Sequence, residues 1–306
     1  MVGGASQAKV VTKRPGSRLN ARRNGFSGII IYVVVIGAVV ITAIPVLHIL
    51  ALSMSGREAV LARKVTLIPR DINFNAYTSV FMDKSMQRAL GFSVTLTLTY
   101  TVFAMMGSIL LAYPLCKARL PGRSWLMLFI LVPMYFSGGI IPEYLWIKTL
   151  KLVDRPLSLL LPVLISTYNT IILRNFFGSI PPSLEESAMI DGAGDFTVLT
   201  RIVLPLSVPA LATLSLFYAV TRWNTFADVR YYINSTQYYT LQMKLYQVVF
   251  NSTDTEVNML EGGRNAVLSD TIKSAAIVFA TAPILAVYPF LQRYFVQGVM
   301  IGAVKE

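Results

Sequence analysis

The chain alternates long apolar runs with polar segments, and this pattern predicts helices that cross a membrane. Because lipid offers backbone groups no hydrogen-bond partner, a chain of this kind must cross as helices. A helix rises about 1.5 Å per residue, so runs of about 17–25 residues can span a hydrocarbon core about 30 Å thick. We therefore expect an all-α polytopic membrane protein with six transmembrane helices. The predicted spans are residues 29–52, 89–113, 125–141, 157–173, 203–220 and 274–291.

Prolines lie inside these predicted helices. Proline removes a backbone hydrogen bond, and membrane helices tolerate it where neighbouring groups or cavities satisfy the freed carbonyl. We expect kinks of the kind found in membrane proteins that open and close. The residues concerned are Pro45, Pro133, Pro162, Pro209, Pro283 and Pro289.

The composition supports a membrane protein and excludes several classes of function. Of the 306 residues, 55% are hydrophobic and only 14% are charged, whereas a soluble domain carries about 25% charged residues. Cys116 and His48 are the only cysteine and histidine, which excludes an internal disulfide and a metal centre built on these residue types. The sequence has no G-x-x-x-x-G-K-[ST] motif to hold nucleotide phosphates, and no paired carboxylates or Ser/His/Asp set lies where a cleft is plausible. We expect a chain that is not an enzyme and has no cofactor or metal of its own.

The basic residues predict which side of the membrane each loop faces. Residues 1–28 hold six lysines and arginines without an acidic residue, and residues 114–123 hold three, which accounts for part of the net charge of +12. The positive-inside rule places both segments in the cytoplasm, with the N-terminus and the C-terminus inside. We expect a basic tail 1–28, a transmembrane domain 29–292 and a cytoplasmic tail 293–306. The loop 174–202 then faces inward, and residues 53–88, 142–156 and a long periplasmic loop 221–273 face outward.

One inward-facing loop, residues 179–203, mixes acidic residues, glycines and helix formers. Ser183 stands three residues before Glu186, which is the spacing of a capping box, and predicts a helix over about 184–190. The glycines of Asp191–Gly194 break that helix, and Asp195 can cap a second helix that continues to Pro205. The first helix is acidic, no basic recognition helix follows, and both ends are tethered to the membrane, so nucleic acid is excluded. We interpret the loop as a docking element for a protein partner.

The loop also resembles a known family motif. The spacing Glu186-x-Ala188-x₃-Gly192-x₉-Ile202-x-Leu204-Pro205 is similar to the EAA loop of bacterial ABC importer permeases, with Ser187 in place of the alanine at the second position of the motif. Four further stretches look like carbohydrate permeases of the maltose-importer G-subunit type, LplC subgroup. They are "NFFGSIPPSLEESAMIDGAG", "LFYAVTRWNTF", "YYTLQMKLYQVV" and "QRYFVQGVMIGAVKE".

This resemblance implies a fold, a location and a set of partners. The fold is the type I importer permease fold, in the bacterial cytoplasmic membrane, with the EAA loop as a coupling helix. The partners are a second, homologous permease subunit, two ATPase subunits that bind ATP and Mg, and a periplasmic or lipid-anchored solute-binding protein. The ATPase-coupling residues carried over are Glu186, Ser187, Ala188, Asp191, Gly192, Leu204 and Pro205. For Glu186, completing the capping box is an alternative role.

Polar and aromatic residues inside the predicted bundle are candidates for a sugar path. Intramembrane polar groups are often functional, although aromatic residues also form interfacial belts and amides also join helices. The candidates are Tyr135, Tyr168, Asn169, Thr170, Tyr218, Arg222, Trp223 and Asn224. We expect an oligosaccharide substrate. Basic residues predicted on the outer side would suit an acidic one, such as a uronate fragment of alginate.

Two other functions fit a six-span membrane protein. A stand-alone secondary transporter would carry intramembrane carboxylates or an internal repeat, and would need no docking loop. A membrane assembly protein would need no ATPase partner and would not transport a substrate. The predicted spans hold no acidic residue well inside them, which favours the importer subunit over the secondary transporter.

Overall fold

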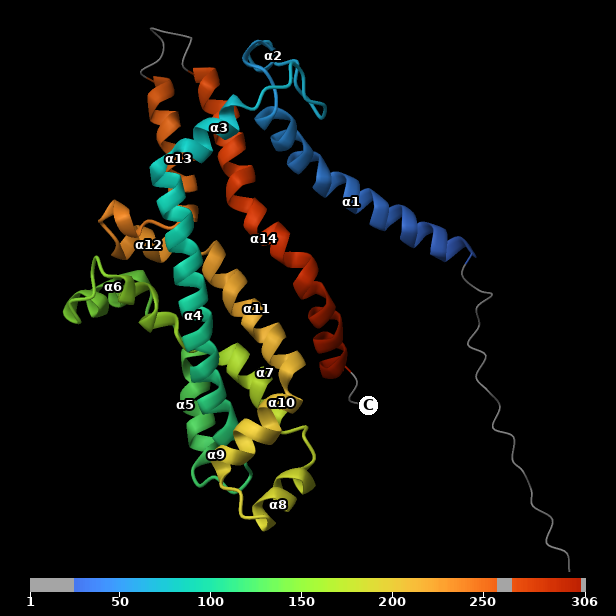
Figure 1. Ribbon diagram of the computed structural model, residues 1–306, viewed down its shortest axis with the longest axis vertical. Helices are drawn as coiled ribbons and strands as arrows, with labels where there is room; N and C mark the ends of the chain where they lie inside the picture. Colours follow the sequence, from blue (N-terminus) through green and yellow to red (C-terminus); the bar gives the residue numbers. More distant parts are fainter. Residues whose placement is uncertain (1–24, 258–265, 304–306) are drawn as a thin grey trace, which may run out of the picture. The chain divides into compact units, whose positions relative to one another are not determined.

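The computed structural model describes residues 25–257 and 266–303, and every regular element in these two ranges is helical (Figure 1). The helices are α1 (Gly25–Ser53), α2 (Arg57–Leu61), α3 (Asn75–Met82), α4 (Lys84–Cys116), α5 (Arg123–Tyr135), α6 (Ile140–Thr149), the 3₁₀ turns η1 (Pro156–Leu159) and η2 (Leu161–Val163), α7 (Thr167–Phe177), α8 (Pro182–Ile190), α9 (Asp195–Val198), the π-helical turn η3 (Leu199–Val203), α10 (Leu204–Leu206), α11 (Val208–Asn224), α12 (Ala227–Tyr232), the 3₁₀ turn η4 (Thr236–Tyr238), α13 (Leu241–Val257) and α14 (Ala266–Ala303).

The helices agree with the predicted fold class. In the described residues, three unbroken helical stretches are long and apolar enough to cross a membrane: Gly28–Ser53, Lys84–Cys116 and Asp270–Pro289. Three further apolar segments form sharply bent helix pairs, so the chain has up to six spans if each pair counts as one. The predicted all-α class is confirmed, and the six expected spans are consistent with this count.

The third predicted span, residues 125–141, is wrong as a single helix. Helix α5 ends at Tyr135, and α6 then leaves at an angle of 116°. Pro133 lies in the last turn of α5, and Gly139 adopts φ +82°, a left-handed conformation that glycine reaches without steric cost. The hydropathy pattern located the apolar segment, and the proline and the glycine determine where it turns.

The fourth predicted span, residues 157–173, begins as two 3₁₀ turns rather than an α-helix. The α-helical part starts only at Thr167, where the hydroxyl of Ser166 accepts a hydrogen bond from the N–H of Asn169 (3.3 Å). The two parts meet at 50°. Pro156 and Pro162 fall in the 3₁₀ turns, where the missing N–H is least costly.

The fifth predicted span, residues 203–220, is also divided. The chain passes through Pro205 within α10 and bends by 82° at Ser207, so Pro205 does not end the second loop helix as expected. Helix α11 starts at Val208, with Pro209 in its first turn, where proline is tolerated. The sixth span keeps Pro283 inside an unbroken α14.

The segments expected to flank the spans are partly helical. The residues of the basic tail before Gly25 and those after Ala303 lie outside the described residues. Helix α14 continues to Ala303, past the expected boundary at residue 292. The expected outer loop 221–273 contains α12, η4 and α13, and its residues 258–265 lie outside the described residues.

Packing centres on α4, which has a buried residue at every fourth position along one side. Rows of side chains at this spacing form ridges that fit the grooves of a neighbouring helix, and small residues let the backbones approach closely. Helix α11 presents a matching row. The two rows are Tyr100, Ala104, Ser108 and Ala112 on α4, and Ala210, Leu214, Tyr218 and Arg222 on α11.

A carboxylate joins two loops at the end of the bundle where α12 lies. Asp154 accepts hydrogen bonds from the hydroxyl (2.6 Å) and N–H (2.7 Å) of Ser235 and from the N–H of Asn234 (3.0 Å). Its own N–H donates to the carbonyl of Tyr232 (2.7 Å). The hydrogen bonds from Ser235, and then that from Asn234, lower the pKa of the Asp154 carboxyl below its ordinary value. The carboxylate therefore holds the loop before η1 against the loop after α12.

The loop between α1 and α3 closes on a buried glycine. The N–H of Gly56 donates to the carbonyl of Arg70 (2.9 Å). A Cβ atom added at Gly56 would lie 2.7 Å from both the Cβ and the carbonyl oxygen of Asp71. No side chain fits at this position without moving the facing backbone.

We expect Gly56→Ala to lower the free energy of unfolding by about 1–3 kcal/mol, because the new methyl group overpacks the loop. Gly91→Ala is the matched control: it lies inside α4 with no atom within 4 Å of the added Cβ, and alanine favours helix by about 1 kcal/mol. Thermal unfolding of the purified protein in detergent measures both. Equal transition midpoints for Gly56→Ala and the wild type would contradict the packing described.

Candidate functional site

The docking loop folds as two short helices joined by a glycine turn. Helix α8 ends at Ile190, where predicted, and starts two residues before the predicted position. Gly192 adopts φ +88°, and the N–H of Ala193 donates back to the carbonyl of Ala188 (2.9 Å). The predicted helix and its glycine break are confirmed, and the left-handed conformation explains why glycine stands at 192.

The predicted caps of these two helices are wrong. Helix α8 has Pro181 at its N-cap position without a side-chain cap, and Ser183 lies inside the first turn. The carbonyl of Ser183 instead accepts a hydrogen bond from the hydroxyl of Ser187 (2.8 Å). The N-cap of α9 is Gly194, with Asp195 as the first helical residue. Prolines can start a helix without a capping side chain because their fixed φ is already helical.

The two sides of the loop differ in their surroundings. Ala188 and Met189 pack against the main buried cluster of α4, α7 and α11, as does Leu204. On the other side Ile190 is 86% exposed and Phe196 is 75% exposed. The predicted coupling residues Glu186, Ser187, Asp191 and Gly192 are exposed as well, and so is Pro205. The capping role of Glu186 is not realised, because the N-cap residue of α8 is Pro181, which has no backbone N–H to donate to the carboxylate.

An ion pair fastens the inner side of α8 to the end of α4. The ammonium group of Lys117, the residue that follows α4, hydrogen-bonds to the carboxylate of Glu185, and both side chains are largely buried. The same ammonium lies 4.3 Å from the centre of the Tyr113 ring. Burial lowers the pKa of Lys117, but the hydrogen bond and charge of Glu185 outweigh it and leave the pKa raised. The lysine therefore stays charged.

Two arginines strengthen this connection. Arg119 donates to the sulfur of Met189 in α8 (3.4 Å). Arg174 of α7 donates to the carbonyl of Leu115 in α4 (3.1 Å). Helix α8 is thus joined to the chain before α5 as well as to its own flanking segments.

A column of polar side chains runs between α4, α7 and α11. The hydroxyl groups of Ser108 and Tyr218 lie 2.6 Å apart, and the hydroxyl of Thr170 donates to Ser108 (3.4 Å). The ring of Tyr100 meets the ring of Tyr218 edge to face at 5.8 Å, and its hydroxyl donates to the carbonyl of Val163 (2.8 Å). These groups satisfy one another inside the bundle.

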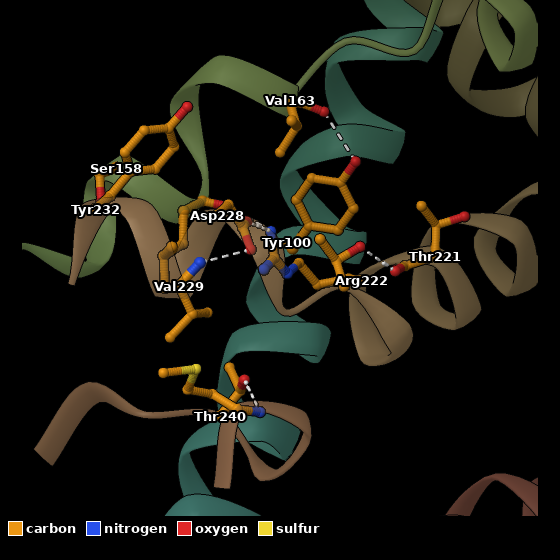
Figure 2. A network of polar contacts seen from close by, with 12 residues as sticks. Tyr100, Ser158, Val163, Thr221, Arg222, Asp228, Val229, Tyr232 and Thr240 are labelled. Atoms are coloured by element: carbon orange, nitrogen blue, oxygen red, sulfur yellow. Dashed lines mark hydrogen bonds and ion pairs between the residues drawn. The ribbon is translucent and has the colours of Figure 1, made fainter. Parts of the chain in front are cut away.

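Arg222 closes the column at the end where α12 lies, and Figure 2 shows it between Tyr100 and Asp228. Its side chain is 2% exposed. Its Nη1 lies 2.6 Å from the Asp228 carboxylate and donates to the carbonyl of Leu159 (3.0 Å). The guanidinium lies 6.0 Å from the centre of the Tyr100 ring. One side chain therefore joins α4, η1, α11 and α12.

The remaining path candidates are scattered. Tyr135 is 76% exposed at the end of α5, and Tyr168 is 58% exposed. Asn169 is buried on α7, Trp223 is half-buried, and the amide of Asn224 donates to its own helix at Val220 (3.0 Å). The structure thus brings together Thr170, Tyr218 and Arg222, and leaves the contact of any of these residues with a substrate as a prediction.

Several residues of these arrangements were missed from the sequence. They are Tyr100, Ser108, Lys117, Glu185 and Asp228. Tyr100 and Ser108 sit eight residues apart, a helical spacing that marks one face. In the sequence, Lys117 bears only on the orientation in the membrane, and the EAA motif includes Glu186 but not its neighbour Glu185. The partners of Tyr100, Ser108, Lys117 and Glu185 lie more than 60 positions away in the chain, as Ser108–Tyr218 and Lys117–Glu185 illustrate, so no local pattern connects them. Asp228 follows its partner Arg222 by six residues, but a break between two helices separates them.

Comparisons with known proteins agree with one another. Residues 16–301 match the family described as "Binding-protein-dependent transport system inner membrane component". The chain is 42% identical over 284 residues to the "Polygalacturonan/rhamnogalacturonan transport system permease protein YtcP" of Bacillus subtilis, covering 92% of this chain and 99% of that protein. It is 43% identical over 270 residues to "Protein LplC" of the same organism, covering 88% and 91%.

Solved structures extend the likeness to the fold. One is a bacterial ABC transporter involved in the import of the acidic polysaccharide alginate. A chain of that structure superposes with a TM-score of 0.82 at 30% identity, covering 90% of this chain and 98% of that one. A chain of a bacterial alginate ABC transporter in complex with an alginate pentasaccharide-bound periplasmic protein shares the fold at 19% identity, with a TM-score of 0.56.

We expect reversal of either charge of the Lys117–Glu185 pair to free α8 from α4. Loss of a charged, partly buried hydrogen bond costs about 1.5–3 kcal/mol, so amide exchange in α8 should rise about tenfold to a hundredfold in Lys117→Glu and in Glu185→Lys. The double reversal should recover most of the protection. Hydrogen exchange followed by mass spectrometry measures the effect.

The matched control is Glu186→Lys, which makes the same charge change on the exposed neighbour and should leave α8 protected. If the double reversal exchanges as fast as the single variants, the pair does not anchor α8.

Proposed function

The chain belongs to the family of binding-protein-dependent transport system inner membrane components, and we propose from this premise that it forms half of the path of an importer for acidic oligosaccharides. As a permease component of an ABC transporter it is a non-catalytic subunit that works with a solute-binding protein. Family membership removes the basis for the two other functions weighed from the sequence, a secondary transporter and an assembly protein.

The docking loop supports a separate ATPase as a partner. Its outer side presents Ile190 and Phe196 to solvent, while its inner side is held by Lys117 and the buried cluster. An exposed apolar surface on a rigid element is typical of a protein interface. We propose that Glu186, Ser187, Asp191 and Gly192 contact one of two ATPase subunits, which bind ATP and Mg, and that Ala188, Leu204 and Pro205 position the loop.

The remaining assembly follows the same proposal. A second, homologous permease subunit completes the path, and the docking loop faces the cytoplasm with both termini on that side. The absence of acidic residues from 1–28 and 114–123 supports this orientation. Lys117 and Arg119 from the second of these segments contact α8, so the structure has the basic loop and the docking loop at the same end of the bundle.

The proposed substrate is an oligosaccharide that carries uronate carboxylates. A relative at 42% identity is named for polygalacturonan and rhamnogalacturonan, and a structural neighbour at 30% identity is described as importing alginate. Both kinds of polymer share a sugar ring with a carboxylate. Galacturonate oligosaccharides are the first choice because the more similar of the two relatives is named for them.

We expect proteoliposomes that contain the complete importer and its binding protein to take up trigalacturonate in preference to maltotriose. The basic residues predicted on the outer side of the membrane and the names of the relatives both favour trigalacturonate, the acidic substrate. Radiolabelled uptake with ATP inside the vesicles measures the preference. A faster uptake of maltotriose would overturn the acidic substrate class and leave the subunit's place in an importer intact.

We also expect a cysteine at Ser187 to crosslink to a cysteine in the groove of the ATPase and to stop transport, because this exposed residue would lie at the contact. The background is Cys116→Ser, since the half-buried thiol of Cys116 donates to Tyr113 (3.0 Å) and would otherwise react. The matched control is Thr149→Cys on α6, an exposed residue outside the docking loop. Efficient crosslinking from Thr149, or none from Ser187, would place the contact elsewhere.

A further inference from the structure

Arg222 carries a buried positive charge, and all its hydrogen bonds lie on one nitrogen. Nη1 pairs with the carboxylate of Asp228 and donates to the carbonyl of Leu159. Figure 2 shows the guanidinium reaching from α11 toward Asp228 at the start of α12. The two partners come from different segments and fix the plane of the guanidinium group.

The other two nitrogens of the group differ sharply. Nε and Nη2 are fully buried, and neither has a hydrogen-bond partner among the residues that the structure describes. A buried donor without a partner costs about 1–3 kcal/mol, and native structures hold few of them. The Tyr100 ring, 6.0 Å away, compensates the charge only in part and accepts no hydrogen bond in the plane of the group.

The Nε–Nη2 edge is the side of a guanidinium that fits a carboxylate. Two parallel N–H groups meet the two oxygens, which gives a strong and directional contact. Nη1 also donates to the carbonyl of Leu159, which lies outside the segment carrying Asp228, so the edge stays oriented when that segment moves. We propose that the Nε–Nη2 edge of Arg222 binds a carboxylate of the transported sugar, and that the segment carrying Asp228 covers this edge between transport events.

The surroundings of Arg222 suit such a covered site. Arg222 lies in the last turn of α11, two residues before that helix ends at Asn224. The segment that carries Asp228 is short, since α12 has only six residues. A non-helical break at Thr225 and Phe226 separates it from α11. A hinge of this kind needs only a few backbone angles to change.

The charge balance favours an acid over a neutral sugar. In the closed arrangement Arg222 and Asp228 neutralise each other. When the segment carrying Asp228 moves away, the guanidinium loses its counter-ion in a low-dielectric setting. A substrate carboxylate then takes the place of Asp228 as the counter-ion. A neutral hydroxyl would supply a hydrogen bond without a charge. This inference rests on the proposed acidic substrate and adds the residue that would select for it.

The test compares Arg222→Lys with the wild type in the complete importer in proteoliposomes. Lysine keeps the charge but loses the paired N–H edge. The two substrates are trigalacturonate and a methyl-esterified, neutral trigalacturonate, and uptake of each by a variant is expressed relative to wild-type uptake of the same substrate. Arg155→Lys, the same change at an exposed arginine of the neighbouring loop, is the control.

We expect Arg222→Lys to lower uptake of the acid about tenfold to a hundredfold, as for loss of a charged bidentate contact, with uptake of the ester changed less than about twofold. Arg155→Lys should change neither. Equal losses for both substrates would mean that Arg222 is structural or pairs with another subunit, and would overturn the site. Unchanged uptake of the acid would overturn it too, while leaving the proposed importer standing. A wild type that carries only the ester would refute the acidic substrate class and the site together.

Discussion

The packing of the helices around α4 depends on how closely α4 and α11 approach each other. Between helices in lipid the hydrophobic effect gives little net attraction, so small side chains and interhelical hydrogen bonds hold them together. Ala104, Ser108 and Ala112 are fully buried on the contact side of α4. The small size of Ser108 lets the Tyr218 hydroxyl reach its Oγ at 2.6 Å. A larger residue at 104 or 108 would separate the helices and leave buried hydroxyl groups without partners, so this contact determines the position of α7 and α11 together.

The same helix connects the two ends of the bundle. At one end Lys117 follows α4 and holds α8, and at the other Tyr100 lies beneath Arg222. The 17 residues between positions 100 and 117 correspond to about 25 Å of helix. Helix α4 is unbroken over that distance, so a displacement of α8 can reach the Arg222 region through α4 as well as through α10 and α11. The proposed docking loop and the proposed substrate site therefore share one rigid element.

The sequence predicted the number and position of the apolar segments because hydropathy depends on composition averaged over about 20 residues. It did not predict where three of them break, because each break depends on a few residues. Pro133 and Gly139 turn the third segment, Pro156 and Pro162 keep the first half of the fourth in 3₁₀ turns, and the fifth bends at Ser207 between Pro205 and Pro209. The capping box failed for a related reason, since Pro181 and Pro182 start α8 earlier than Ser183 could. Long-range pairs such as Ser108–Tyr218 and Lys117–Glu185 leave no local pattern at all.

The docking helix illustrates why neighbouring acidic residues differ in role. Successive residues of a helix point about 100° apart, so Glu185 and Glu186 cannot face the same surroundings. Glu185 faces inward to Lys117, and Glu186 is exposed. Helix α8 has only nine residues, and isolated helices shorter than about 12–15 residues are marginal in water. Its stability therefore comes from contacts on its inner side, which are the contacts that join it to α4. A docking helix of this length cannot be both stable and detached from the bundle, and the residues that keep it folded are the ones through which it would transmit a partner's movement.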